Sequence, residues 1–407
     1  MSHRIMTSFA EGLAITSETP EDMQIASGSE SSPYLRHLKF TQLTSGLRGA
    51  LERLRGDGTQ LSELNGTILG TDGFAGIAKL SFFIKCLAEK AFLQHRLEID
   101  GELFIDLRPM TGECRFDPLQ VVADRAYLLS RFAYLRRGDG DKMILASPKS
   151  SGLATLHNRA ALTAFYHLTK PCTSADLAEA IESMEEESAR GFMAFLASTG
   201  ALEPVDENGE TRDDTDPALA QWSFHDLVFH AKSRMGRHDQ PFGATYRHAK
   251  RFETLPISKP PMSDEPIPLY KPDMDRLMRE EVPFSAIQNT RQSVREYGKT
   301  PITLEQLGEF LYRTARIKHS NEEAKVSWRP SPSGGALHEL EIYPAVQNCE
   351  GLPFGLYHYD PAGHQLSRVT SAAEQEVKQL LGFAELAGVL EEPAQVLLII
   401  AARFQRN

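Results

Sequence analysis

The segment RQSVREYGKTPITLEQLGEFL (residues 291–311) and the later segment PSPSGGALHELEIYPAV (residues 330–346) decide the fold of the C-terminal part of this chain. Thr303 and Gln306 have the spacing of a capping box, which predicts a helix start. The helix carries its apolar residues on one face: Leu304, Leu307 and Leu311. A loop rich in proline and glycine then leads to residues 340–346, which predict a buried strand. The pattern is typical of an α+β domain.

The first chemical candidate is the pentapeptide at residues 291–295, which holds two arginines and a serine. Guanidinium groups bind phosphate through paired hydrogen bonds. Side chains alternate along an extended segment, so Arg291, Ser293 and Arg295 would point the same way and could meet one phosphate. The alternative is a solvated surface turn.

The second candidate is the loop at residues 330–338. Gly334 and Gly335 would let the backbone approach a flat ligand closely, and Pro330 and Pro332 would hold the shape of the loop. The alternative is an ordinary connection between a helix and a strand.

Upstream of these segments the sequence predicts two hairpins, each associated with helices. Asp100-Gly101 lies between alternating apolar residues, which is a strong hairpin signal. A second hairpin is expected around residues 138–141, and Thr173 with Asp176 forms another capping box. Helices next to small hairpins indicate two winged-helix-like units. Because no basic recognition face is present, pairing with an extended peptide is the expected use.

We therefore expect the following organisation. A disordered tail (residues 1–35) precedes winged-helix-like domain 1 (36–125) and winged-helix-like domain 2 (126–220). A connector that is proline-rich at its end (221–273) leads to the α+β domain (274–407). The continuous apolar run at residues 396–402 predicts a central strand buried on both faces.

Composition narrows the possible classes of function. The net charge of −11 and the lack of a basic stretch argue against a nucleic-acid partner. The four scattered cysteines suit a reducing compartment, and the start of the chain lacks the apolar core of a signal peptide. We expect a cytoplasmic protein with no membrane segment and no metal site.

The motif order R-x-S-x-R, capped helix, P-S-x-G-A and L-E-I-Y resembles the nitroreductase-like FMN-dependent oxidoreductases. The closest resemblance is to the branch of SagB-type dehydrogenases, or azoline oxidases. The stretch SFHDLVFHAKSRMGR (residues 223–237), the stretch GATYR (residues 243–247) and the paired winged-helix-like units also look like that branch. The resemblance covers residues 40–407.

The resemblance implies FMN bound at the interface of a homodimer. By similarity, Arg291, Ser293 and Arg295 would hold the phosphate and ribityl chain, and Gln292 would help. A second set would border the isoalloxazine ring from the partner subunit: Pro332, Ser333, Gly334 and Gly335. Members of the family continue beyond the strand at residues 396–402, so we expect a flavin domain that is incomplete at its C-terminus. We assign no catalytic residue.

The resemblance also implies a reaction, the oxidation of thiazoline or oxazoline rings in a ribosomally made peptide to thiazoles or oxazoles. The implied partners are the peptide substrate and a cyclodehydratase. Two alternatives stay open: a general NAD(P)H-dependent nitro or quinone reductase, and a non-catalytic peptide-binding partner without a flavin site. The long N-terminal region disfavours the reductase, because a small substrate needs no peptide-binding platform.

Overall fold

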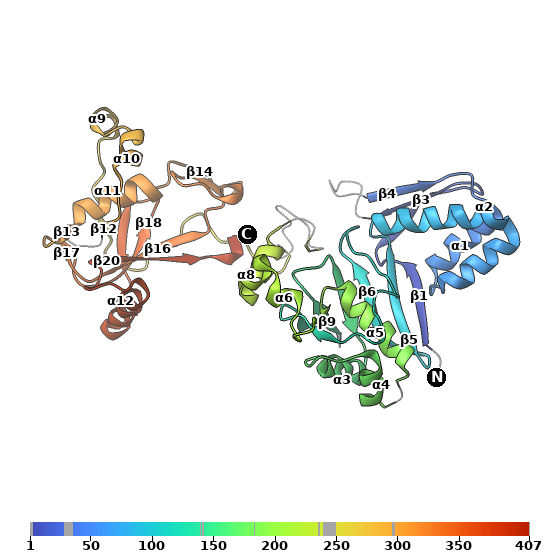
Figure 1. Cartoon of the computed structure of the whole chain (residues 1–407). Coiled ribbons are helices and arrows are strands. Elements are labelled where there is room, and N and C mark those ends of the chain that lie inside the picture. The colour runs from blue at the N-terminus through green and yellow to red at the C-terminus, as the bar shows by residue number, and fades with distance from the viewer. Residues whose placement is uncertain are drawn as a thin grey trace. The chain divides into compact units, whose positions relative to one another are not determined.

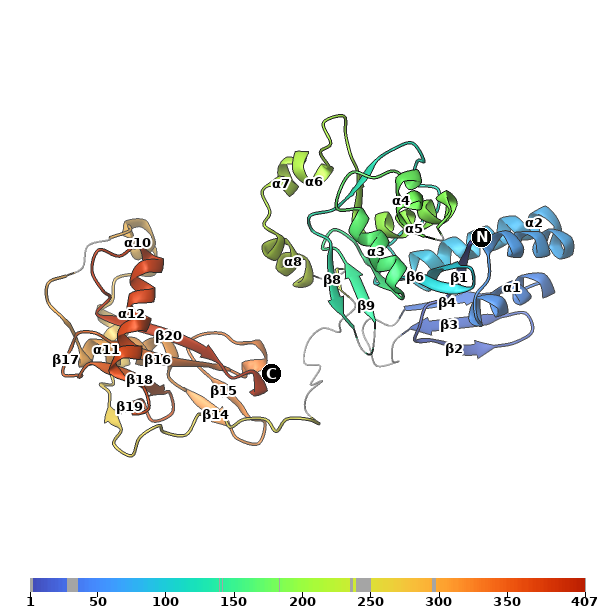
Figure 2. The ribbon, with the colours of Figure 1, turned by 90° about the horizontal axis from the view of Figure 1, so that it is seen from below.

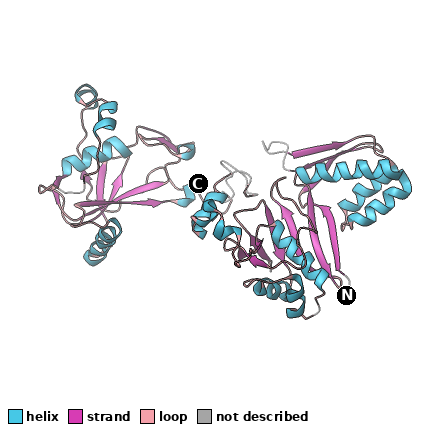
Figure 3. Ribbon diagram, in the orientation of Figure 1, coloured by secondary structure: helices cyan, strands magenta, loops and turns pink. Residues whose placement is uncertain are grey.

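A computed structural model describes residues 3–27, 36–138, 140, 142–182, 184–234, 237–238, 250–294 and 298–406. The chain divides into two compact units, residues 1–240 and residues 241–407. Each unit mixes helices with strands, so the expected α+β class is confirmed (Figure 3). The division falls inside the segment expected as a connector.

A six-stranded antiparallel sheet forms the centre of the first unit, with strand order β1-β5-β6-β10-β9-β8 (Figure 1). Its strands are β1 (His3–Phe9), β5 (Leu93–Ile99), β6 (Glu102–Pro109), β8 (Tyr134–Arg137), β9 (Met143–Ala146) and β10 (Gly152–Leu156). Both predicted hairpins are present, as β5–β6 and β8–β9. Asp100 and Gly101 both have positive φ, as a tight hairpin turn requires. The sheet crosses the expected domain boundary at residues 125 and 126, and the winged-helix interpretation is not confirmed.

The expected disordered tail is wrong for residues 3–27, which form three strands. One is β1, and the other two are β2 (Leu13–Glu18) and β3 (Met23–Ser27), which join β4 (Arg36–Phe40) in a three-stranded sheet. Met23 and Ile25 are 1% and 0% exposed and pack into a core with α1 (Ser45–Arg55). These strands are short and flanked by polar residues, so the apolar content of the segment did not reveal them.

Helix α2 (Leu61–Glu89) bends at Gly73, which has a non-helical conformation with φ 68°. Among the described residues, α2 is the one helix that is long and apolar enough to cross a membrane, by length and composition only, and 22% of its most apolar window is buried. Core helices of soluble proteins, which are mostly buried, pass the same test. Its inner face, which includes Leu64, Ile68 and Leu80, packs into the same core as α1.

The second half of the first unit is rich in helices. They are α3 (Arg159–His167), α4 (Ser174–Ala180), α5 (Glu186–Ser198), α6 (Arg212–Thr215), α7 (Pro217–Ala220) and α8 (Phe224–Lys232). A small two-stranded sheet pairs β7 (Tyr127–Leu129) with β11 (Leu202–Pro204). Phe192 of α5 meets Phe104 of β6 edge to face at 5.2 Å. The predicted capping box at Thr173 and Asp176 is confirmed.

The second unit is built on a five-stranded sheet with strand order β12-β19-β18-β16-β20 (Figures 1 and 2). Its strands are β12 (Ile267–Pro268), β16 (Leu340–Val346), β18 (Gly355–Asp360), β19 (Gln365–Arg368) and β20 (Val396–Ala402). Helix α11 (Leu304–Ala315) and helix α12 (Glu374–Gly388) pack into two separate apolar clusters on this sheet. The capping box of α11 at Thr303 and Gln306 is confirmed.

The remaining elements of the second unit lie around this sheet. They are α9 (Met274–Glu280), α10 (Phe284–Thr290), β13 (Ile302–Thr303), β14 (His319–Asn321), β15 (Val326–Trp328), η1 (Gly334–Ala336), β17 (Cys349–Glu350) and η2 (Phe404–Arg406).

The prediction that residues 396–402 form a central strand is wrong. Strand β20 lies at the edge of its sheet and pairs only with β16 among the described strands. Ile400 is 63% exposed. A continuous aliphatic run shows that a strand has apolar faces, but it does not say whether a neighbour lies on each side.

Candidate functional site

The first candidate segment directly follows α10. Helix α10 is separated from α9 by a break that contains Pro283. Arg291 is the C-cap of α10, and its backbone N–H donates to the carbonyl of Ile287 at 2.9 Å. From Arg291 the chain leaves the helix.

The side chains of this segment are available to a ligand. Arg291, Gln292 and Ser293 are exposed, and no hydrogen bond or ion pair joins their side chains to another described residue. Arg295 lies outside the described residues. A free guanidinium beside an amide and a hydroxyl is a donor set that fits a phosphate group.

The second candidate segment is the loop that contains η1. Pro332, Gly334 and Gly335 are exposed, and Ser333 is half-buried. Gly335 has a φ of 61°, a conformation that glycine adopts without strain. A Cβ added to Gly334 would meet no atom within 4 Å, so the space beside this backbone is open. An open, exposed stretch of glycine backbone fits the edge of a flat ring.

The hydroxyl of Ser333 holds this loop closed. It accepts the backbone N–H of His338 at 2.9 Å and donates to Glu339 at 3.2 Å. His338 is buried, and burial together with the nearby Arg329 guanidinium lowers its pKa. The His338 imidazole is therefore neutral at pH 7.

Arg406 fixes the same loop from the other end of the sequence. Its guanidinium is 2% exposed and donates to three backbone carbonyls, those of Leu337, Leu255 and Lys325, at 2.8 to 2.9 Å. Three separate segments therefore meet on one buried side chain.

A buried cluster of charges lies under the loop. Glu341 of β16 contacts the ring of His358 at 2.7 Å, and both side chains are almost fully buried. Nε of Arg403 lies 2.7 Å from the other carboxylate oxygen of Glu341, an ion pair without hydrogen-bond geometry. Arg403 also donates to the carbonyls of Pro256 and Ile257. These contacts hold the strands and the preceding connector together beneath the loop.

The structure does not bring the two candidate segments together within one chain. Helix α10 and the β14–β15 hairpin, which η1 contacts, lie at different ends of the second unit in both views (Figures 1 and 2). No hydrogen bond, ion pair or ring contact links residues 291–294 to residues 330–338 in the described part of the chain.

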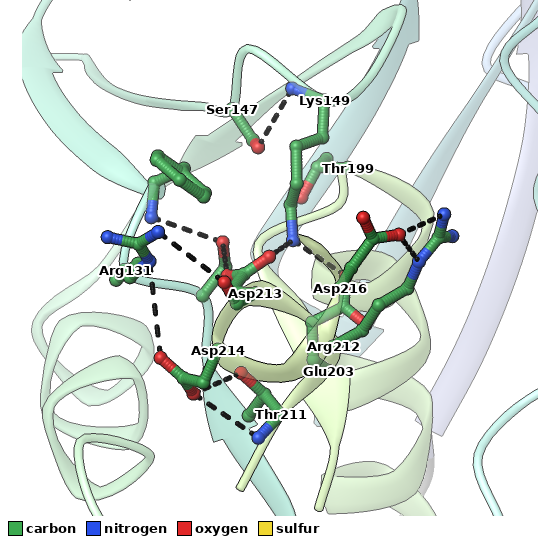
Figure 4. Close-up of polar contacts among 12 residues, drawn as sticks. Arg131, Ser147, Lys149, Thr199, Glu203, Thr211, Arg212, Asp213, Asp214 and Asp216 are labelled. Atoms are coloured by element: carbon green, nitrogen blue, oxygen red, sulfur yellow. Dashed lines mark hydrogen bonds and ion pairs between the residues drawn. The ribbon is translucent and has the colours of Figure 1, made fainter. Parts of the chain in front are cut away.

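A third polar cluster lies in the first unit, around Lys149 (Figure 4). Its ammonium group lies 2.5 Å from Asp213, which is 0% exposed, and 2.6 Å from Glu203. The hydroxyl of Ser130 donates to the second carboxylate oxygen of Asp213 at 2.6 Å. Because one ammonium group bridges two carboxylates, we interpret this cluster as structural, and it ties α6 to β11 and to the segment after β9.

The histidines and cysteines form no metal centre in the described ranges. No group of three His, Cys, Asp or Glu side chains that could hold a metal ion lies among these residues. All four cysteines are free.

The sequence did not predict the roles of Glu341, His358, Arg403 and Arg406. Glu341 offered one signal, since it is a charged residue inside an otherwise apolar strand and so requires a buried partner. The partner could not be identified from the sequence, because His358 and Arg403 are distant along the chain.

Comparison with known proteins gives two family matches. Residues 127–239 match the model of the cyanobactin oxidase ThcOx, and residues 289–407 match that of the nitroreductase family. Each match lies within one of the two units. Together they confirm the resemblance to the azoline-oxidase branch of the nitroreductase-like proteins.

Two individual proteins are also similar. A curated protein of Methanocaldococcus jannaschii, named as a nitroreductase, is 32% identical over 128 residues, which are 31% of this chain and 61% of that protein. The chain thus spans about three fifths of the length of that relative. A chain of the E. coli microcin synthetase complex, solved with a truncated pro-peptide bound, is 18% identical with a TM-score of 0.21. The alignment covers 44% of this chain and 65% of that one. A score this low does not establish a shared architecture.

Proposed function

We propose that this nitroreductase-like protein of the SagB-type azoline-oxidase branch is an FMN-dependent dehydrogenase that converts thiazoline or oxazoline rings of a peptide into azoles. The observation that carries the proposal is the exposed Arg291 guanidinium, which pairs with no described residue, in a segment whose residue pattern and family match agree. The match to a cyanobactin oxidase in the other unit supports a peptide as the substrate.

In this proposal the chain binds and orients the cofactor. Arg291, Ser293 and Arg295 hold the phosphate, and Gln292 assists. The backbone at Gly334 and Gly335, with Pro332 and Ser333 beside it, would border the isoalloxazine ring, since the space beside Gly334 is open. The bound flavin supplies the hydride acceptor.

The reaction removes two hydrogens from the azoline ring. A bound flavin would accept one of them as a hydride, and a base would take the other as a proton. We assign that base to no described residue. The Glu341–His358 pair is too deeply buried to reach a substrate, so it supports the fold of the site instead.

A dimer would supply the second half of the flavin site. Helices α9 and α10 have no buried residues, and Phe284 is 73% exposed. Apolar side chains presented in this way favour association with another protein surface. A homodimer would also bring the loop of one subunit to Arg291 of the other, which a single chain does not do.

The first unit is the proposed peptide platform. Strands β2 and β4 are the outer strands of their three-stranded sheet, and an extended peptide could add to either edge through main-chain hydrogen bonds. The azoline itself forms when a serine, threonine or cysteine side chain cyclises onto the backbone with loss of water. A cyclodehydratase is therefore the proposed partner that supplies the substrate, and both proteins would act in the cytoplasm.

The test is titration of the purified chain with FMN, followed by visible absorption and flavin fluorescence. The double variant Arg291→Ala/Arg295→Ala should bind FMN at least about tenfold more weakly, because charge-assisted hydrogen bonds to phosphate are lost. The control is Arg53→Ala/Arg55→Ala on α1 of the first unit, which removes the same charge from exposed positions outside the proposed dimer surface and should leave binding unchanged. A protein that takes up no FMN would contradict the flavin proposal and favour the non-catalytic peptide-binding alternative.

The relative from Methanocaldococcus jannaschii favours a second candidate, a general NAD(P)H-dependent nitro or quinone reductase. The flavin-loaded protein should then consume NAD(P)H with a nitroaromatic or quinone and need no peptide. Azole formation from an azoline peptide, without added NAD(P)H, would support the first proposal over this one.

A further inference from the structure

A cavity of about 380 Å³ opens at the C-terminal end of α11 in the second unit. Residues of three segments form its walls: Lys271, Tyr312, Arg316, Ile317, Lys318, His319, Pro361, Ala362 and His364. None of them belongs to the two candidate flavin segments, so this cavity is a separate feature.

The charge of the cavity walls is of one sign. Lys271, Arg316 and Lys318 are cations, and no aspartate or glutamate lines the cavity. Asp360 lies next to the wall, but its carboxylate accepts the N–H of Ala362 at 2.9 Å and the amide of Gln365 at 3.1 Å. No ion pair joins the three cations to any described carboxylate. Cations that converge without a counter-charge attract an anion into the space between them.

Arg316 is held in place by its own helix. Its guanidinium lies 4.3 Å from the centre of the Tyr312 ring, and Nη1 donates to the Tyr312 carbonyl at 2.7 Å. That hydrogen bond offsets the negative end of α11, which would otherwise repel an anion. The remaining N–H groups of a positioned guanidinium suit the oxygens of a phosphate.

His364 forms an uncharged part of the wall. Its Nε2 lies 2.8 Å from the Tyr270 carbonyl, which can only accept, so Nε2 carries the proton. Burial lowers the pKa of His364, so the ring is neutral and Nδ1 accepts the hydroxyl of Tyr359 at 2.9 Å. The positive charge of the cavity therefore comes from the lysines and Arg316.

The size of the cavity and the apolar side chains among its walls indicate what accompanies the anion. Small-molecule sites in proteins usually have volumes of about 300–1,000 Å³, far more than a bare phosphate ion occupies. Tyr312, Ile317, Pro361 and Ala362 add apolar surface beside the cations. We propose that this cavity binds the phosphate monoester of a small molecule, with the phosphate between Lys271, Arg316 and Lys318. The proposal does not depend on the flavin proposal.

The probes are phenyl phosphate and inorganic phosphate, measured by isothermal titration calorimetry on the whole chain. Phenyl phosphate should bind more tightly than inorganic phosphate. Lys271→Glu/Lys318→Glu should weaken its binding by about tenfold or more, because two attractive charges become repulsive. Both lysines are exposed, so the variant should keep its fold, which circular dichroism checks. Lys142→Glu/Lys170→Glu in the first unit makes the same change in net charge and should have no effect.

Three results would overturn the proposal. They are the absence of phenyl phosphate binding to the wild type, equal affinity for the two probes, and unchanged binding in Lys271→Glu/Lys318→Glu. Binding that persists in this variant but disappears in Arg291→Ala/Arg295→Ala would place the phosphate at the candidate flavin segment. That pattern would refute this site while supporting the flavin proposal.

Discussion

At the scale of single residues, the side chains of the candidate site differ in how far the sequence alone predicts them. Arg291 and Gly335 belong to short motifs whose chemistry is local, so they could be chosen without knowledge of the fold. The buried contacts of Glu341 with His358 and of Arg406 with Leu337 join residues that are distant in sequence. Such pairs leave no periodic pattern, because the strands that carry them fix their spacing only after folding.

Arg406 gives the first prediction. Arg406→Leu should lower the free energy of unfolding by about 3 kcal/mol, because a buried, charge-assisted donor is removed and three carbonyls lose their partner. Urea unfolding followed by circular dichroism measures the change. Arg279→Leu, at an exposed position of α9, is the control and should unfold like the wild type. If Arg406→Leu were as stable as the wild type, these three hydrogen bonds would not be what holds the loop.

His95 gives a prediction about pH. Its Nδ1 lies 3.1 Å from the buried hydroxyl of Thr7, its ring packs 4.5 Å from that of Phe116, and burial lowers its pKa from 6.5 to about 4. The unfolded chain therefore binds a proton that the folded chain does not, between pH 6.5 and about 4. The contribution to stability is complete above pH 6.5 and is lost as the pH falls towards 4, by up to about 3 kcal/mol.

Two measurements check this expectation. An NMR titration should show the His95 ring protonating near pH 4, and urea unfolding at several pH values should show the loss of stability. In His95→Gln the free energy of unfolding should depend less on pH over this range. A His95 resonance that titrates near 6.5 would refute the role of burial.

At the scale of elements, local sequence signals predicted turns and helix starts correctly. The position of a strand within its sheet was not predicted. The Asp100-Gly101 turn and the capping boxes at Thr173 and Thr303 formed where expected, because each depends on a few consecutive residues. The position of β20 within its sheet depends on which strands lie beside it. The strands at residues 3–27 become stable only when distant helices cover them, so their own sequence gave too weak a signal.

Helix α6 provides the prediction at this scale. Lys149→Met should destabilise the first unit by about 3–5 kcal/mol, because Asp213 would keep a buried charge without a counter-charge. The control Arg212→Met breaks a surface ion pair with Asp216 and should cost at most about 0.5 kcal/mol. Denaturant unfolding measures the loss of stability in each of these two variants. The double variant Lys149→Met/Asp213→Leu should recover part of the loss, and a further loss instead would show that the ion pair is not the cause.

At the scale of the whole molecule, the two units correspond to two separate family matches. The match to a cyanobactin oxidase ends at residue 239, and the match to the nitroreductase family begins at residue 289, on opposite sides of the unit boundary at residue 240. The apolar clusters of the two units also share no residue. Each unit therefore has its own core, which is the condition for folding as an independent domain.

This separation predicts that the chain can be divided. A fragment of residues 1–240 should fold cooperatively on its own, and Lys149→Met should destabilise it as much as it destabilises the whole chain. If the first unit is the peptide platform, this fragment should bind an azoline peptide but no FMN. Two outcomes would contradict this prediction: the fragment is unfolded, or Lys149→Met destabilises only the whole chain. Either result would mean that the first unit needs the second for its stability, and peptide binding and flavin binding would then have to be treated as properties of one cooperative structure.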